Sequence, residues 1–293
     1  MALNLQTFKT RALTAVIFVV VMMFGLLYNS WSFFILFTIV HFGAWVEYQK
    51  LVNVFNPSYQ QISVAHRYGI MIAGFCLLLF FSNNSLSFGN FYFTEPGFYG
   101  GITMMVLLPI IMLMESKTIF LKNIVYSLVG LIYISLPLAL MIDLRTYWSK
   151  DLASLSLTIP LLIIFSIWIN DTMAYIVGSF IGKTPLSSIS PKKTWEGTIG
   201  GIILTIVVIT LLAVFTKRIE PLHAAIMSAL AAITGTYGDL FESKLKRMAG
   251  VKDSGSIMPG HGGFLDRFDS LLFAAVAVWF YAAFFIKLPR TTF

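Results

Sequence analysis

The stretch from Gly238 to Ser270 holds the side chains of this chain that are best suited to chemistry. Ten of its 33 residues are charged, against 11% of the whole chain. Asp239 and Glu242 are three residues apart, and so are Asp266 and Asp269, so each pair can share one face of a helix. Carboxylate oxygens from two helices can hold Mg²⁺, which leaves its other positions to water and phosphate. The stretch therefore predicts a metal site for a phosphate ligand.

Basic residues and glycines surround these acids. Ser243 and Lys246 continue the helical face of Asp239 at i+4 and i+7. The glycines allow backbone to approach a ligand closely, and the interleaved lysines and arginines favour a polyanionic ligand. The alternative is a solvated loop whose charges only set the membrane topology.

The order of the residues favours the first interpretation. The strings SKLKR, KDSG and PGHGGFLDRFD resemble the signature of the phosphatidate cytidylyltransferases, also called CDP-diacylglycerol synthases. Met258 departs from that signature, which usually carries Leu or Ile there. An upstream string, ND…AY…G…GK…SPKKTWEG, extends the resemblance to residues 170–270. The matching signature positions are Ser243, Lys246, Arg247, Lys252, Asp253, Pro259, His261, Gly262, Gly263, Asp266, Arg267 and Asp269.

The resemblance implies a nucleotidyltransferase of phospholipid biosynthesis that converts CTP and phosphatidate to CDP-diacylglycerol and pyrophosphate. The nucleophile of this reaction would be the lipid phosphate, which is already ionised at neutral pH. The chain would then need no nucleophile of its own and no strong general base. It would have to overcome the repulsion between two anions, which a divalent metal and fixed cations can do.

Spacing and resemblance together assign Asp239 and Asp266 as Mg²⁺ ligands, with Asp269 and Asp253 as weaker candidates and a second metal ion left open. The turn from His261 to Gly263 would offer backbone N–H groups to an anion at the start of the last helix. The residues expected to be catalytic are Asp239, Asp266, Asp269, Lys246 and Arg247. The residues expected to bind substrate are Lys192, Lys193, Lys252, His261, Gly262, Gly263, Arg267, Asp171 and Ser243.

A second polar cluster lies upstream. Asn170 and Asp171 interrupt an apolar run, and a carboxylate at membrane depth is costly enough to be a functional candidate. The alternative is a structural hydrogen bond between helices. Lys192 and Lys193 would by composition form a basic patch for anionic lipid. The resemblance instead makes them holders of the phosphatidate head group or of the triphosphate.

The composition places the chain among membrane proteins. Of its 293 residues, 58% are hydrophobic and 15% aromatic, and the mean hydropathy is +0.84. The lone cysteine, Cys76, excludes a disulfide within the chain and favours a buried structural thiol. The net charge of +7 is spread over short loops, which predicts no nucleic-acid partner. The expected partners are CTP, phosphatidate and membrane lipids, with homodimer formation left open.

The apolar runs predict an all-α polytopic membrane protein with about nine spanning helices. With a cytoplasmic N-terminus, 14 of the 20 lysines and arginines lie inside, as the positive-inside rule requires. This orientation predicts a site that faces the cytoplasm from the cell membrane. Residues 1–150 are expected to be scaffold and residues 151–293 the catalytic region of one membrane domain. The predicted spans are 12–29, 31–48, 68–82, 98–115, 120–142, 157–180, 198–216, 222–241 and 264–286.

Two GxxxG pairs, Gly178 with Gly182 and Gly197 with Gly201, predict close helix packing. Two other functions remain open. One is a CTP-dependent enzyme acting on another lipid, such as a polyprenol kinase or an archaeal-lipid cytidylyltransferase that makes CDP-archaeol. The other is a transporter with an ion site at broken helices, which Asn170 and Asp171 would indicate. Most paired charges are expected beside the membrane and not at its midplane, which disfavours transport.

Overall fold

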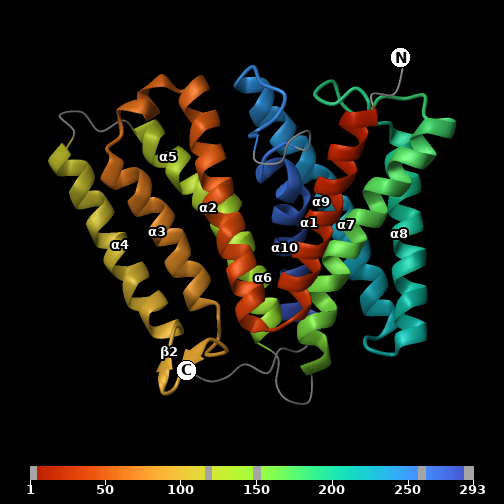
Figure 1. Ribbon diagram of the computed structural model, residues 1–293, viewed down its shortest axis with the longest axis horizontal. Helices are drawn as coiled ribbons and strands as arrows, with labels where there is room; N and C mark the ends of the chain where they lie inside the picture. Colours follow the sequence, from red (N-terminus) through yellow and green to blue (C-terminus); the bar gives the residue numbers. More distant parts are fainter. Residues whose placement is uncertain (1–4, 116–120, 148–152, 257–261, 287–293) are drawn as a thin grey trace. The chain divides into compact units, whose positions relative to one another are not determined.

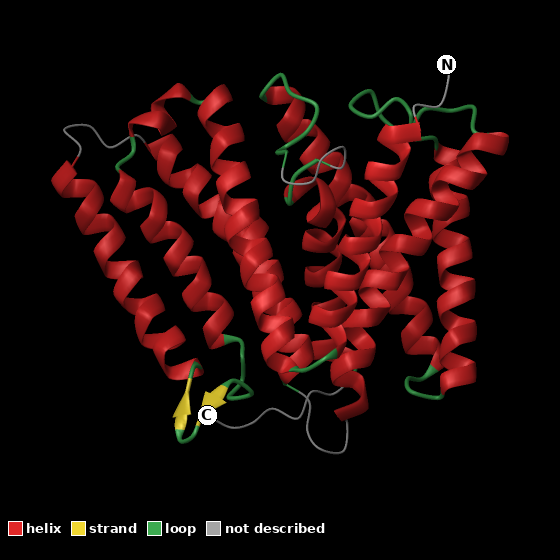
Figure 2. Ribbon diagram, in the orientation of Figure 1, coloured by secondary structure: helices red, strands yellow, loops and turns green. Residues whose placement is uncertain are grey.

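The computed structural model of the protein describes residues 5–115, 121–147, 153–256 and 262–286 (Figures 1 and 2). Almost all ordered elements are helices, joined by short loops. One short antiparallel hairpin, which the sequence did not predict, is formed by β1 (Ser87–Phe88) and β2 (Phe91–Tyr92). The helices are α1 (Leu5–Leu27), α2 (Ser30–Phe55), η1 (Pro57–Gln61), α3 (Val64–Phe80), α4 (Thr94–Glu115), α5 (Leu121–Gly130), η2 (Leu131–Ser135), α6 (Leu136–Thr146), α7 (Ala153–Ile181), α8 (Trp195–Thr216), α9 (Pro221–Met248) and α10 (Leu265–Phe285).

Seven helical segments among the described residues are long and apolar enough to cross a membrane. Two shorter apolar helices, Val16–Leu27 and Val64–Phe80, accompany them. An all-α polytopic membrane protein is therefore confirmed at this level, whereas the count of nine and the cytoplasmic N-terminus stay predictions. The seven segments are Ser30–Phe55, Thr94–Met114, Lys122–Thr146, Ser154–Ile181, Trp195–Thr216, Pro221–Met248 and Leu265–Phe285.

The chain forms two compact units, each built from two segments of the sequence. Unit 1 comprises Met1–Ser135 and Met248–Phe268, and unit 2 comprises Leu136–Arg247 and Asp269–Phe293. The loop after α9 and the first turn of α10 therefore belong to unit 1, while the rest of α10 belongs to unit 2. The expected functional division at residue 150 stays a prediction.

Helix α2 is the buried centre of unit 1. Asn29 caps its N-terminus by accepting a hydrogen bond from the Ser32 backbone N–H at 2.8 Å. Further along, the indole N–H of Trp45 donates to Ser135 Oγ at 2.9 Å, and both side chains are buried. On α3, Cys76 is a buried free thiol, as its lone occurrence in the sequence predicted.

In unit 2, α7 and α8 lie side by side through their glycines (Figure 1). A Cβ atom on Gly197 would lie 2.9 Å from the Cα atom of Gly178. A Cβ atom on Gly201 would lie 2.9 Å from the backbone oxygen of Asn170. Because only hydrogen atoms fit at these positions, Gly197 packs directly on Gly178, and Gly201 packs on the α7 backbone at Asn170 and Ala174. The predicted close packing is confirmed.

We expect Gly201→Val to destabilise the protein by about 1–3 kcal/mol, because the added methyl groups must push two backbones apart. The measurement is the unfolding temperature of purified protein in detergent. Gly101→Val on α4 is the matched control, because a Cβ atom there would have its nearest neighbour 3.9 Å away. Equal unfolding temperatures for the two variants would contradict the packing.

Candidate metal and phosphate site

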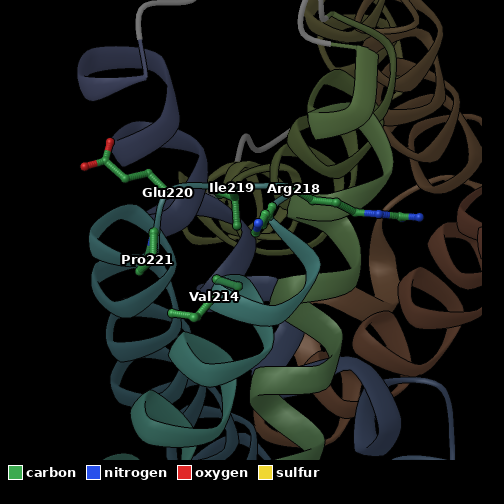
Figure 3. Close-up of a pocket in the computed structure, with 7 residues that line it drawn as sticks. Val214, Arg218, Ile219, Glu220 and Pro221 are labelled. Carbon is green, nitrogen blue, oxygen red and sulfur yellow. The ribbon is translucent and has the colours of Figure 1, made fainter.

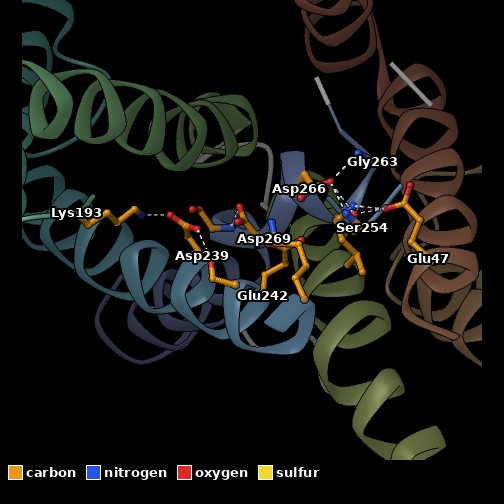
Figure 4. A network of polar contacts seen from close by, with 12 residues as sticks. Glu47, Lys193, Asp239, Glu242, Ser254, Gly263, Asp266 and Asp269 are labelled. Atoms are coloured by element: carbon orange, nitrogen blue, oxygen red, sulfur yellow. Dashed lines mark hydrogen bonds and ion pairs between the residues drawn. The ribbon is translucent and has the colours of Figure 1, made fainter. Parts of the chain in front are cut away.

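Three carboxylates of unit 2 form an acidic cluster: Asp239 and Glu242 on α9, and Asp269 on α10. One ligand oxygen from each lies within 4.8 Å of those of the other two (Figure 4). The helices come this close because Gly238 has no side chain. A Cβ atom on Gly238 would collide with the backbone of Asp269 and would lie 3.2 Å from the Cα atom of Ser270. Glu242 and Asp269 are buried, so their charges need partners.

Two lysines balance part of this charge. Lys193 forms an ion pair with Asp239 (Figure 4). Lys246 forms one with Glu242, one turn away on α9. Burial lowers the pKa of Lys193, and the nearby carboxylates of Asp171 and Asp269 oppose that shift. The cluster thus brings three carboxylates and two ammonium groups together. Hard oxygen ligands of this kind suit a divalent cation such as Mg²⁺.

A closed loop between α7 and α8 places Lys193. The Leu186 backbone N–H donates to the Lys193 carbonyl at 2.7 Å, and the Trp195 N–H donates to the Thr184 carbonyl at 2.9 Å. The carboxylate of Glu196 accepts the backbone N–H groups of Lys183 and Thr184, each at 3.2 Å. These bonds hold both ends of the loop together, so that Lys193 points toward α9.

Asn170 and Asp171, adjacent in sequence, have different roles in the structure. Asn170 is 4% exposed, and its Nδ2 donates to Thr236 Oγ1 on α9 at 3.4 Å. Asn170 therefore forms a hydrogen bond between helices, which was the structural alternative to a functional role. Asp171 is exposed and acts electrostatically on Lys193 and on Asp269. Asp171 therefore stays a candidate for the site.

Asp266 belongs to unit 1 and holds the loop that precedes α10. Its Oδ2 accepts the Gly263 N–H at 2.7 Å, the Ser254 N–H at 2.8 Å and the Ser254 hydroxyl at 2.9 Å (Figure 4). A helix-start carboxylate that reaches back to the preceding backbone resembles half of a capping box. Gly262 has φ +78°, a conformation that glycine adopts readily. The Gly263 N–H, expected to meet a substrate anion, already donates to this carboxylate.

The expected site residues therefore fall into two groups, and each group lies within one unit. Of the predicted metal ligands, Asp239 and Asp269 come together with Glu242, which the sequence analysis had placed on the same helical face but had not assigned. His261 lies outside the described residues. Unit 2 holds Asp171, Lys192, Lys193, Asp239, Ser243, Lys246, Arg247 and Asp269. Unit 1 holds Lys252, Asp253, Gly262, Gly263, Asp266 and Arg267.

The residues of the two groups also differ in their local contacts and in their exposure to solvent. Ser243 Oγ donates weakly to Asp239 Oδ1 at 3.4 Å. The exposed residues of the two groups are Asp171, Lys192, Arg247, Lys252, Asp253 and Arg267.

A pocket of unit 2 lies at the loop between α8 and α9 (Figure 3). Its polar lining comes from Lys217, Arg218 and Glu220. It contains none of the residues expected to bind metal or substrate, so the acidic cluster remains the candidate site of unit 2.

The sequence is similar to known cytidylyltransferases. The sequence profile described as the cytidylyltransferase family matches residues 9–285. Phosphatidate cytidylyltransferase 4, chloroplastic, from Arabidopsis thaliana is 45% identical over 41% of this chain and 31% of its own length. The phosphatidate cytidylyltransferase of Synechocystis sp. is 40% identical over 50% of this chain and 52% of its own. That of Rickettsia bellii is 37% identical over 64% of this chain and 80% of its own. The matched part thus spans about a third of the Arabidopsis protein and about half of the Synechocystis protein.

Glu196→Ala should loosen the loop that carries Lys193, because two backbone N–H groups lose their acceptor. We expect hydrogen exchange in residues 183–195, measured by mass spectrometry, to become several-fold faster. Glu220→Ala is the control, because Glu220 is an exposed acid outside this loop that lies next to His223. Unchanged exchange in the Glu196 variant would show that the loop is held by other contacts.

Proposed function

Because this chain belongs to the cytidylyltransferase family, we propose that it transfers CMP from CTP to phosphatidate and so forms CDP-diacylglycerol and pyrophosphate. The observation that carries the proposal is the acidic cluster of Asp239, Glu242 and Asp269 with Lys193 and Lys246 bound to it. The relatives named phosphatidate cytidylyltransferase support the choice of substrates.

In the proposed reaction, an oxygen of the phosphatidate phosphate attacks the α-phosphorus of CTP. The bond between that phosphorus and the oxygen bridging to the β-phosphate breaks, and pyrophosphate leaves with the electron pair. No proton transfer is needed, because the attacking phosphate is ionised and pyrophosphate is a stable anion. The residues must therefore bind, align and neutralise the phosphates.

We assign the acidic cluster as the Mg²⁺ site, with Asp239, Asp269 and Glu242 as the residues that would hold the ion. When bound, Mg²⁺ would supply positive charge to the attacking and leaving oxygens. Asp266 and Asp253 stay predicted ligands, and a second ion stays open. Asp266 Oδ2 already accepts three hydrogen bonds, so metal binding through that oxygen would have to compete with the loop before α10.

The lysines at the cluster would neutralise substrate phosphates. Lys193 and Lys246 already lie against carboxylates, so a cation bound by those carboxylates would favour turning the ammonium groups toward phosphate. Arg247, one residue beyond Lys246, is exposed and can meet a phosphate from solvent. The other expected binding residues stay predictions: Lys192, Lys252, His261, Gly262, Arg267, Asp171 and Ser243. The Gly263 N–H would have to leave Asp266 Oδ2 in order to meet a substrate anion.

We place this activity in the cell membrane with the site toward the cytoplasm, where CTP is found. The positive-inside bias of the lysines and arginines supports that orientation. Helices apolar enough to span a membrane support access to a lipid substrate.

The direct test incubates the purified protein with labelled CTP, phosphatidate and Mg²⁺. We expect a nucleotide-bearing lipid and pyrophosphate, and we expect EDTA to stop their formation. A phosphorylated lipid together with CDP would instead indicate a lipid kinase. Activity with archaeal-lipid substrates alone would indicate a related cytidylyltransferase. Solute flux in liposomes without CTP would indicate a transporter.

Asp239→Asn and Asp269→Asn should each reduce kcat by at least about a hundredfold. Each substitution removes one negative charge from the proposed cation site. A bound metal ion stabilises the charge of the transition state by several kcal/mol. Each loss of about 1.36 kcal/mol slows the reaction tenfold. Glu220→Gln, an exposed acid outside the cluster, is the control and should keep wild-type activity. Near-normal turnover in either aspartate variant, with Mg²⁺ still required, would remove that residue from the metal assignment.

A further inference from the structure

Glu47 on α2 is a buried carboxylate to which the sequence analysis gave no role. Glu47 is only 4% exposed, and it lies in a helix that is apolar enough to span a membrane. Burial of a carboxylate is costly unless donors meet it. Three hydrogen-bond donors of unit 1 meet the Glu47 carboxylate, and none of them belongs to α2. They come from residues more than two hundred positions later in the chain.

Two of these donors are backbone groups at the start of α10. Glu47 Oε1 accepts the Phe264 N–H at 2.9 Å, and Oε2 accepts the Leu265 N–H at 2.9 Å (Figure 4). The first N–H groups of a helix have no partner within the helix, and a negative charge is favoured there. Glu47 thus caps α10 from another helix.

The third donor links Glu47 to Asp266. The Ser254 hydroxyl lies 2.8 Å from Glu47 Oε2 and 2.9 Å from Asp266 Oδ2. One proton cannot serve both acceptors fully, so this hydroxyl is shared between the two carboxylates. The two acids together hold both described ends of the loop that precedes α10.

Glycines leave the space that the Glu47 carboxylate and the start of α10 occupy. A Cβ atom on Gly255 or Gly263 would collide with the Glu47 carboxylate. One turn earlier on α2, a Cβ atom on Gly43 would collide with the Phe264 ring. Gly43 and Glu47 are four residues apart, so they present one continuous face to the loop. This shape leaves little freedom to the first turn of α10.

We propose that Glu47 is a positioning residue for the transfer reaction, because it sets where α10 begins and hence where the acids of its first turns lie. Asp266 is the next residue after the capped Leu265, and Asp269 follows one turn later on the same helix. The inference rests on the proposed function. It adds an acid outside the signature stretch that acts through backbone groups and touches no substrate.

The test compares wild type with Glu47→Gln, which keeps the side-chain volume but removes the charge. We expect faster hydrogen exchange in peptides covering residues 262–268. We also expect kcat to fall about 10- to 100-fold, because displacement of reacting groups by about 1 Å can have that effect. With Mg²⁺ alone as probe, the concentration that half-saturates the rise in unfolding temperature should increase several-fold.

Asp143→Asn is the matched control for a structural effect of removing a buried charge. Asp143 is 6% exposed and accepts the Trp279 indole N–H of α10 at 2.6 Å, within unit 2. We expect this variant to unfold at a lower temperature but to keep its Mg²⁺ midpoint and its kcat. If Glu47→Gln behaves in the same way, with kcat and Mg²⁺ midpoint within twofold of wild type, the positioning role is overturned.

A milder variant tests the proposal if Glu47→Gln fails to fold. Ser254→Ala removes the shared hydroxyl and leaves both carboxylates in place, and we expect smaller changes in the same directions. No change in exchange, kcat or Mg²⁺ midpoint would overturn the proposal. If wild type forms no nucleotide-bearing lipid, the proposed function fails. The Mg²⁺ midpoint and the exchange rates would still decide whether Glu47 positions the acids of α10.

Discussion

The constraint on which this structure depends is that a carboxylate in an apolar helical protein must be met by donors or cations. The chain satisfies it in two ways. Glu47 and Asp266 accept backbone N–H groups of a loop and a helix start, and Glu196 does the same at the loop after α7. Asp239 and Glu242 instead meet lysine side chains. Carboxylates bound to backbone hold the chain in shape, whereas a carboxylate paired with a lysine side chain can exchange that partner for another cation.

Glycine makes both arrangements sterically feasible. Gly238 lets α9 approach α10 where the acidic cluster forms, and Gly263 lets a loop reach the Glu47 carboxylate. Gly197 and Gly201 let α8 pack on α7, the helix before the Lys193 loop. In each case backbone approaches where a side chain would exclude it. The proposed chemistry therefore depends on residues that have no side chain.

Within each unit, the acids and bases come from segments that are distant in sequence. Asp239 and Asp269 belong to different helices, and Lys193 comes from a third segment between α7 and α8. For phosphate transfer this matters, because the reaction needs alignment and charge and no nucleophile from the protein. A site made in this way is sensitive to residues that only hold the helices in place, as proposed for Glu47.

The sequence by itself determined the membrane class, the helical fold and the family, because hydrophobic length and motif order are local properties that need no knowledge of contacts. It also placed Asp239, Glu242 and Lys246 on one face, because helical spacing is local too. Only the tertiary structure decided that Glu242 and Asp269 join Asp239, that Asp266 is bonded to its own loop, and that Glu47 caps α10. These pairings join residues up to 218 positions apart, and no periodicity in a sequence records which distant backbone N–H group a buried carboxylate will meet.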